Sequence, residues 1–196
     1  MKFVLATHNP GKLKEMGAIL ARFGVEVVSP RDLGITVDVE ETGTTFAENA
    51  MLKAKAICAA AKLPAIADDS GLCVDALNGG PGVYSARYGG EGLDDKGRYM
   101  LLLNNMRGQP TRAAHFACAI ACAFPNGDEL TAEGRCDGTI AFAPMGEDGF
   151  GYDPVFFVPE LKKTFGQLTA EEKSAISHRG RALAAFVEKL ETYLKK

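Results

Sequence analysis

Residues 7–12, which read Thr-His-Asn-Pro-Gly-Lys, are of types that suit the binding of an anion. They follow an apolar run at residues 3–6 and precede apolar side chains at helical spacing, so the pattern predicts a strand that leads into a helix. A helix start offers free backbone N–H groups and a positive dipole end, and Lys12 adds a full charge. The spacing is not that of a P-loop. An ordinary turn, with Asn9 as N-cap and Pro10 at the first helical position, is therefore an equal alternative.

A second lysine, Lys53, lies on the inward face of another predicted helix. The Thr-x-x-Glu form of a capping box at residues 45–48 opens this alanine-rich helix, which we expect to continue to about residue 62. At 100° per residue Lys53 lies near the middle of its apolar stripe. Burying an unpaired ammonium costs several kcal/mol or more, so a phosphate ligand is favoured over a snorkelling surface residue. Lys55 lies off the stripe and is expected in solvent.

Carboxylates occur as two adjacent pairs, Glu40-Glu41 and Asp68-Asp69. The aspartates follow a buried strand at residues 65–67 and are expected to form an acidic turn with the next two residues, Ser and Gly. Neighbouring aspartates repel each other unless a cation intervenes, and their hard oxygen ligands suit Mg²⁺. The pattern therefore favours a functional site at the aspartates over a simple turn cap. For the glutamates taken alone, a solvated loop is the better interpretation.

Aromatic and basic side chains gather in the last third of the chain. Residues 150–154, Phe-Gly-Tyr-Asp-Pro, combine rings with a glycine that permits close backbone approach, so this segment could stack on a base or form an ordinary turn. Lys173 precedes Ser-His-Arg at residues 177–179, near the last helix. These side chains are either ligand donors or a solvated helix terminus. A further segment, residues 84–88, is interpreted as packing or subunit contact.

The elements that must position these residues alternate between strands and helices over the first hundred residues, which predicts an α/β fold. Two extended stretches around Asn-Gly-Asp at residues 126–128 are typical of an antiparallel hairpin. We therefore expect a mixed β-sheet flanked by helices, in a single domain over residues 1–196 with two lobes and a cleft between them. The remaining expected elements are strands at 25–28 and 155–158 and helices at 94–106 and from 180 onward.

Composition excludes several classes of protein. The 22 basic and 25 acidic residues give a formal net charge of −3, which offers no global reason to bind nucleic acid or an anionic membrane. No apolar run approaches the roughly 20 residues of a membrane span, and the start of the chain does not read as a signal peptide. The five cysteines are odd in number and form no Cys-x-x-Cys pair, so they are interpreted as core residues in a reducing compartment. We therefore expect a cytoplasmic protein.

Taken together, these blocks resemble the signature set of the inosine/xanthosine triphosphate pyrophosphatase family. They follow one another over nearly the whole chain, and the set is far more specific than any single block. The matching blocks are residues 7–12, 40–43 with Phe46, 48–50, 67–72, 81–88, 149–154, 172–174 and 177–179.

The resemblance implies Mg²⁺-dependent hydrolysis of non-standard purine nucleoside triphosphates (ITP, dITP and XTP) to the monophosphate and pyrophosphate. Such an activity removes non-standard nucleotides from the nucleotide pool and so prevents their incorporation into DNA and RNA. It also implies a homodimer of elongated α/β subunits. By position, Glu40 and Asp69 would organise the metal, and Asp69 would accept the proton of the attacking water. The implied substrate-binding residues are Thr7, His8, Asn9, Pro10, Gly11, Lys12 and Lys53 at the triphosphate, and Ser70, Phe150, Gly151, Tyr152, Asp153, Lys173, His178 and Arg179 at the rest of the substrate.

Two other functions stay open at this point. A regulatory nucleotide-binding protein could use the same residues without turnover, but it would have little use for Asp69 beside a triphosphate unless a metal bridged them. A pyrophosphatase for modified pyrimidine nucleotides would differ only in its contacts to the base.

Overall fold

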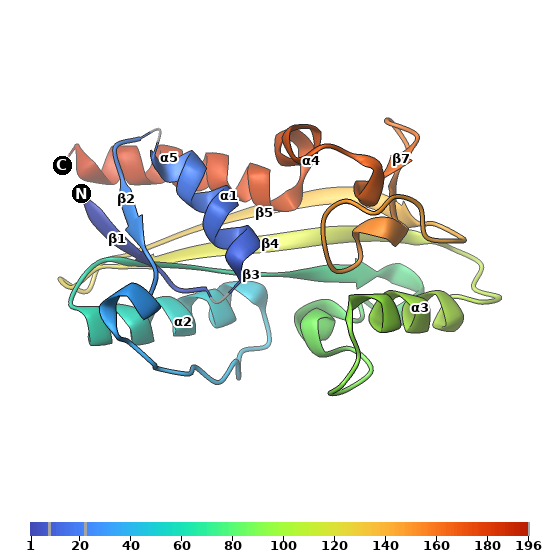
Figure 1. The fold of residues 1–196 in the computed structure, drawn as a ribbon, viewed down its shortest axis with the longest axis horizontal. Coiled ribbons are helices and arrows are strands. Elements are labelled where there is room, and N and C mark those ends of the chain that lie inside the picture. Colours follow the sequence, from blue (N-terminus) through green and yellow to red (C-terminus); the bar gives the residue numbers. More distant parts are fainter. Residues whose placement is uncertain (8, 22, 196) are drawn as a thin grey trace. The chain divides into compact units, whose positions relative to one another are not determined.

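The computed structural model describes residues 1–7, 9–21 and 23–195 (Figure 1). The described part of the chain forms a seven-stranded sheet in the order β2-β1-β3-β4-β5-β6-β7. Strand β1 pairs in parallel with β2 and β3, whereas β6 pairs antiparallel with β5 and β7. The predicted mixed α/β sheet is confirmed. Its strands are β1 (Lys2–Leu5), β2 (Glu26–Val28), β3 (Ala65–Val74), β4 (Ala113–Ala123), β5 (Glu129–Ile140), β6 (Phe156–Val158) and β7 (Lys163–Thr164).

The helices lie close to where the sequence predicted them, with one addition. The capping box that opens α2 is present, because Thr45 Oγ1 accepts the Glu48 N–H at 3.1 Å and the Glu48 carboxylate accepts the Thr45 N–H at 3.1 Å. The addition is the short α4, which the sequence analysis did not predict. The helices are α1 (Pro10–Ala21), α2 (Phe46–Ala61), α3 (Asp95–Asn105), α4 (Ala170–Ile176) and α5 (His178–Leu194).

The chain divides into two compact units, and β3, β4, β5 and α5 each contribute residues to both. The single domain over residues 1–196 and the cleft between lobes stay predictions. Unit 1 comprises Met1–Asp69, Cys118–Gly134 and Arg181–Lys196, and unit 2 comprises Ser70–Ala117 and Arg135–Gly180.

Unit 1 buries both faces of its strands. Since successive strand residues point to opposite faces, Leu5 and Ile66 pack with α1 and α5, whereas Val4 and Ala67 pack with α2. Figure 1 shows α1 and α5 on one side of these strands and α2 on the other. The face toward α2 is lined by small side chains. Its buried alanines are Ala50 and Ala54 of α2, Ala65 and Ala67 of β3, and Ala119, Ala121 and Ala123 of β4.

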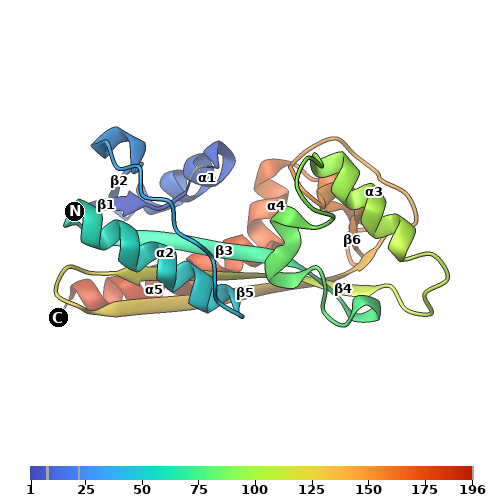
Figure 2. The same cartoon turned by 90° about the horizontal axis from the view of Figure 1, so that it is seen from below.

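Unit 2 has its own apolar core. Leu102 of α3 and Met106, the residue that caps its end, are fully buried there, and Ile176 of α4 packs against the same cluster. Its aromatic centre includes Phe116, whose ring lies 4.7 Å from that of Phe156. Figure 2 shows α3 and α4 on one side of the ends of β3 and β4. This core supports the loop that precedes β6.

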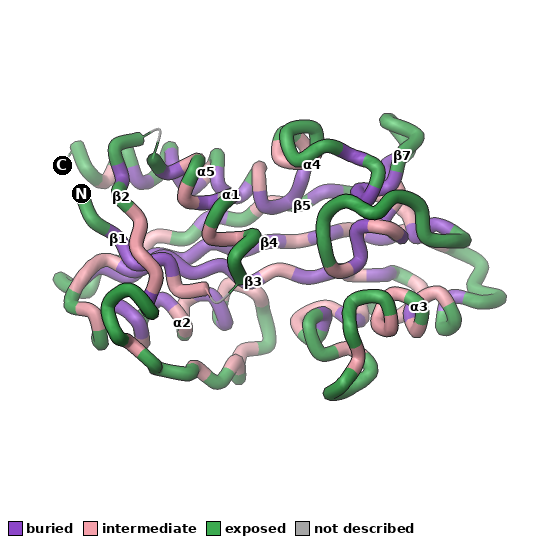
Figure 3. Tube along the Cα trace, viewed as in Figure 1, coloured by how far each residue is buried: buried purple, intermediate pink, exposed green. Residues whose placement is uncertain are grey.

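The predicted acidic turn at residues 68–71 is wrong, because β3 runs without a break from Ala65 to Val74. Leu72 and Val74 are buried and continue the alternation, so the extended pattern persists beyond the two aspartates. By contrast, the segment between β2 and α2 runs along the surface and is exposed along much of its length (Figure 3). No helix among the described residues is long and apolar enough to cross a membrane.

Candidate functional site

The strand character of β3 separates Asp68 from Asp69. Because they are consecutive in a strand, their side chains point to opposite faces, Asp68 toward the face of α1 and Asp69 toward that of α2. Each helix supplies a lysine to its face. Lys12 Nζ of α1 lies 2.8 Å from Asp68 Oδ2, and Lys53 Nζ of α2 lies 3.7 Å from Asp69 Oδ1. The repulsion expected between adjacent aspartates is thus relieved by geometry and by two ammonium groups.

The start of α1 is a capped helix terminus. Asn9 Oδ1 accepts the N–H groups of Gly11 at 2.9 Å and Lys12 at 3.2 Å, and the helix begins at Pro10. The Asn9 N–H in turn donates to Thr7 Oγ1 at 3.1 Å. The alternative with Asn9 as N-cap and Pro10 at the first helical position is therefore confirmed. His8 lies outside the described residues.

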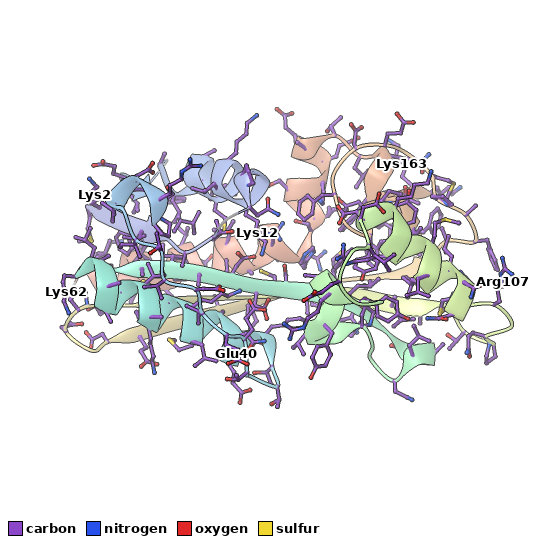
Figure 4. All side chains as sticks on the ribbon, turned by 60° about the horizontal axis from the view of Figure 1, so that its bottom comes forward. Lys2, Lys12, Glu40, Lys62, Arg107 and Lys163 are labelled. Atoms are coloured by element: carbon purple, nitrogen blue, oxygen red, sulfur yellow. The ribbon has the colours of Figure 1, made fainter. Side chains whose placement is uncertain are left out.

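This capping changes the argument for an anion site. The sequence analysis relied on free backbone N–H groups, but those of Gly11 and Lys12 are bonded to the Asn9 side chain. The Lys12 ammonium is a positive charge that this turn offers a ligand (Lys12 is labelled in Figure 4). The Lys12 side chain is 17% exposed and lies beside the buried Asp68.

Lys53 bridges two carboxylates. Its Nζ lies 2.6 Å from Glu41 Oε1 and 3.7 Å from Asp69 Oδ1. Glu41 is held nearby because the loop that carries it is anchored to α2, where Asn49 Oδ1 accepts the Gly43 N–H at 2.7 Å. The inward placement of Lys53 that its helical stripe predicted is confirmed.

Glu41 was the less expected of the two glutamates. Glu40, which the family resemblance implies as a metal ligand, lies on the exposed loop (Figure 4), and Glu41 is the glutamate that pairs with Lys53. A loop without regular structure gives no periodicity from which to tell two adjacent glutamates apart. The anchoring of Gly43 by Asn49 fixes the choice, and no sequence pattern reports that contact.

The pKa of Asp69 is set by opposing effects of its surroundings. Burial raises the pKa of this carboxyl above its ordinary value, Lys53 opposes the rise, and the negative charge of Glu41 adds to it. The side-chain amide of Asn49 also favours the charged form. An additional cation at this place would therefore be favoured.

The donor set here is small. No group of three or more His, Cys, Asp or Glu side chains among the described residues is arranged to hold a metal ion alone. Glu41 and Asp69 supply two carboxylates, which fits Mg²⁺, since that ion keeps several waters and takes one or two carboxylates together with phosphate oxygens. The residues therefore fit a magnesium ion that a phosphorylated ligand helps to bind.

Unit 2 carries the second cluster, built around Asp153. Asp153 is buried, and its Oδ2 accepts the Phe150 N–H at 2.9 Å and lies 2.5 Å from Lys173 Nζ. Burial raises the pKa of Asp153, and the Lys173 ammonium opposes that rise. Gly149 has φ +81°, and a Cβ there would lie 2.0 Å from Asp153 Oδ2, so the loop requires glycine at that position.

The Phe150 ring is partly exposed and flanked by two cations. Lys173 Nζ lies 4.6 Å from the ring centroid, and Arg179 Cζ lies 5.5 Å from it. Arg179 is itself buried, and its Nη2 donates to Ser70 Oγ at 3.2 Å. The structure therefore brings together five of the predicted residues, which are Ser70, Phe150, Asp153, Lys173 and Arg179.

Two other predicted residues are held by the core of unit 2. His178 is buried, with its ring stacked at 4.6 Å on that of Phe116. Tyr152 is also buried, and its hydroxyl donates to the Ser85 carbonyl at 2.6 Å, which anchors the loop 149–153.

The unpredicted α4 carries Lys173, and the capping box that Thr169 forms with Glu172 marks its start. This Thr-x-x-Glu pattern is present in the sequence and could have predicted the start of α4.

Comparison with known proteins gives consistent results. A model of the Ham1 family matches residues 3–189. The protein of Geobacillus kaustophilus named dITP/XTP pyrophosphatase is 52% identical over 97% of this chain and 94% of its own length. The Bacillus subtilis protein of the same name is 48% identical over 96% of each chain. A solved HAM1 protein structure from Coxiella burnetii has a TM-score of 0.90 at 41% identity, covering 100% of this chain and 98% of that one.

Proposed function

This chain belongs to the Ham1 family, and on that basis we propose that it is a nucleoside triphosphate pyrophosphatase acting on dITP, ITP and XTP. It hydrolyses them to the monophosphate and pyrophosphate and thereby cleanses the nucleotide pool. The observation that carries the proposal is the pairing of each consecutive aspartate of β3 with a lysine from a different helix. That arrangement places a cation beside an acid on each face of β3, and a reaction on a polyphosphate uses both kinds of group.

Lys12 and Lys53 bind the triphosphate in this proposal. An ammonium has three donors, so each lysine can keep its carboxylate partner and still donate to a phosphate oxygen. The partners Asp68, Glu41 and Asp69 hold the ammonium groups in place before substrate binds. Thr7 and Asn9 shape the turn that presents Lys12.

Asp69 is the proposed general base. Burial raises the pKa of this carboxyl, which makes the carboxylate a better acceptor of a proton from water. The water that loses this proton attacks the α-phosphorus, and pyrophosphate leaves with its charge balanced by Lys12 and Lys53.

Glu41 and Asp69 are the carboxylates that would hold Mg²⁺, with Glu40 as the alternative suggested by sequence. The ion, when bound, neutralises charge on the phosphates and favours ionisation of a bound water. Support for this assignment comes from the two carboxylates that share a single ammonium.

Unit 2 recognises the base in the proposal. The Phe150 ring stacks on the purine, and the cations beside it, Lys173 and Arg179, offer N–H donors. Inosine and xanthosine have an acceptor at position 6, whereas adenosine has a donor there. Arg179 has no acceptor, so an adenine base would place donors against donors, which disfavours ATP. His178 packs behind these residues and Gly151 continues the loop.

We also propose a cytoplasmic homodimer that binds a small-molecule nucleotide and no nucleic acid or membrane. The segment first considered for subunit contact is the 3-10 helix η3 (Gly82–Arg87) with its flanking residues. Within it Tyr84 is 59% exposed and carries the Arg87 guanidinium 5.0 Å from its ring, which suits an interface. Sedimentation at micromolar concentration tests this, and a monomer of about 21 kDa would refute it.

The activity is tested by incubating the protein with Mg²⁺ and a panel of nucleoside triphosphates in water enriched in ¹⁸O. We expect pyrophosphate and a monophosphate that carries the heavy oxygen, with dITP, ITP and XTP preferred over ATP. Heavy oxygen in the pyrophosphate instead would move the attack to the β-phosphorus. Binding without turnover would support a regulatory nucleotide-binding protein, and a preference for modified pyrimidine nucleotides would overturn the base assignment.

A further inference from the structure

Two adjacent acids at the start of α3 perform different tasks. Asp94 is the N-cap, and its Oδ1 accepts the Gly97 N–H at 2.7 Å. Asp95 is the first helical residue, and its Oδ2 instead accepts the N–H of Gly151 at 2.8 Å, 56 residues further along the chain. The Asp95 carboxylate therefore joins α3 to the loop 149–153, and both ends of this bond lie within unit 2.

The loop is braced by two carboxylates on consecutive N–H groups. Asp153 accepts the Phe150 N–H from inside the loop, and Asp95 accepts the Gly151 N–H from outside it. Gly149 and Gly151 both have positive φ, at +81° and +60°, which is a backbone conformation that residues other than glycine rarely adopt. Phe150 is the residue between these glycines, so its position follows from the two bonds.

The exposure of Phe150 makes the two backbone bonds important for the position of its ring. Phe150 is 39% exposed, and the Lys173 and Arg179 cations lie 4.6 and 5.5 Å from its ring centroid. We infer that Asp95 is a positioning residue that sets the Phe150 ring for stacking on the base. This inference rests on the proposed function only in taking the ligand of Phe150 to be a purine.

Three variants of the full-length protein test the inference. Asp95→Ala removes the acceptor, whereas Asp95→Asn removes the charge but keeps an oxygen that can accept the Gly151 N–H. Asp94→Ala is the matched control, because it weakens the first turn of α3 without touching that bond. The rate of backbone hydrogen exchange over residues 146–156 measures how firmly the loop is held. Steady-state kinetics with ITP measure whether the loop affects binding of the base.

We expect Asp95→Ala to increase the rate of hydrogen exchange in this loop about fivefold to tenfold. That is the change expected when one ordinary hydrogen bond no longer stabilises the closed form of the loop. Asp95→Asn and Asp94→Ala should stay within about twofold of the parent. In Asp95→Ala the KM for ITP should rise about threefold to tenfold with kcat little changed, since stacking is equal in the ground and transition states. Inhibition by inorganic tripolyphosphate, which has no base, should be unaltered.

Unchanged loop exchange in Asp95→Ala would overturn the inference, as would equal acceleration in Asp94→Ala. Faster exchange with an unaltered KM would also overturn it, because the loop would then move without affecting the base. A parent protein that hydrolyses no purine triphosphate would refute the proposed function instead. In that case the exchange data alone decide whether Asp95 holds the loop.

Discussion

Replacing Lys53 with methionine probes the centre of the unit 1 cluster. Methionine keeps the aliphatic stem and the helix propensity, so α2 should form normally. The change removes an ammonium 2.6 Å from Glu41 and 3.7 Å from Asp69. The three side chains are 18%, 27% and 11% exposed, which places the pairs between exposed ion pairs and fully buried ones. We therefore expect a loss of about 1 to 3 kcal/mol in the free energy of unfolding.

The effect on activity should exceed the effect on stability. A hydrogen bond from a charged group contributes about 1.5 to 3 kcal/mol, so losing one phosphate contact lowers kcat/KM roughly 10- to 150-fold. Lys55→Met is the matched control on the same helix. Lys55 pairs with Glu129 at 2.7 Å, but their side chains are 54% and 42% exposed, so its removal should cost at most about 1 kcal/mol.

The assay is pyrophosphate release from dITP with Mg²⁺ varied, together with thermal unfolding of both variants. Lys55→Met should match the parent in kcat/KM. Equal kcat/KM values for Lys53→Met and Lys55→Met would refute the assignment of Lys53 to the triphosphate. A loss of activity in Lys53→Met that stabilising solutes restored would show that the lysine acts only on folding.

Three further changes have defined outcomes. Asp69→Asn should lower kcat about 10²- to 10⁴-fold yet raise the melting temperature. Between pH 3.8 and the raised pKa of Asp69 the folded state binds more protons than the unfolded chain, so the charge lowers stability as pH rises, and the gain should be larger near pH 8 than near pH 4. The acid limb of the parent's kcat/KM should accordingly lie above pH 3.8. Gly149→Ala should raise the KM for ITP and destabilise the protein more than Gly127→Ala, because Gly127 has φ +92° but open space around it, so its change costs only the roughly 1 to 2 kcal/mol of backbone strain. Arg179→Ala should narrow the preference for ITP over ATP, measured as the ratio of kcat/KM values, and an unchanged ratio would show that Arg179 does not read the base.

The elements of the fold could largely be predicted because their signals are local. The capping box at Thr45 marks the start of α2, and the Asn-Gly-Asp turn joins β4 to β5. The stripe of α2 likewise placed Lys53 on an inward face before its partners were known. Period and capping depend on neighbouring residues only, so the sequence reports them directly.

The errors arise where a distant contact decides. Asp68-Asp69-Ser70-Gly71 has the composition of a turn, but it lies inside β3, which is a neighbour of β4 in the sheet and stays extended to Val74. The backbone N–H groups of Gly11 and Lys12, which were expected to be free, donate to the Asn9 side chain. Asp95 gives no signal at all, since its partner lies 56 residues away. Composition describes what a residue favours alone, and tertiary pairing overrides it.

The alanine lining between α2 and the sheet has a consequence for how this protein can evolve. With methyl groups such as Ala54 and Ala67 at this interface, the helix sits close to the strands, and that separation sets how far the Lys53 ammonium stands from Asp69. A larger side chain at either alanine would lift the helix and lengthen that distance, so a change in an apolar interior would alter a charge interaction it never touches. Sequence change at these buried positions is therefore limited by the Lys53–Asp69 distance as well as by packing. A core substitution that leaves folding intact can still abolish activity.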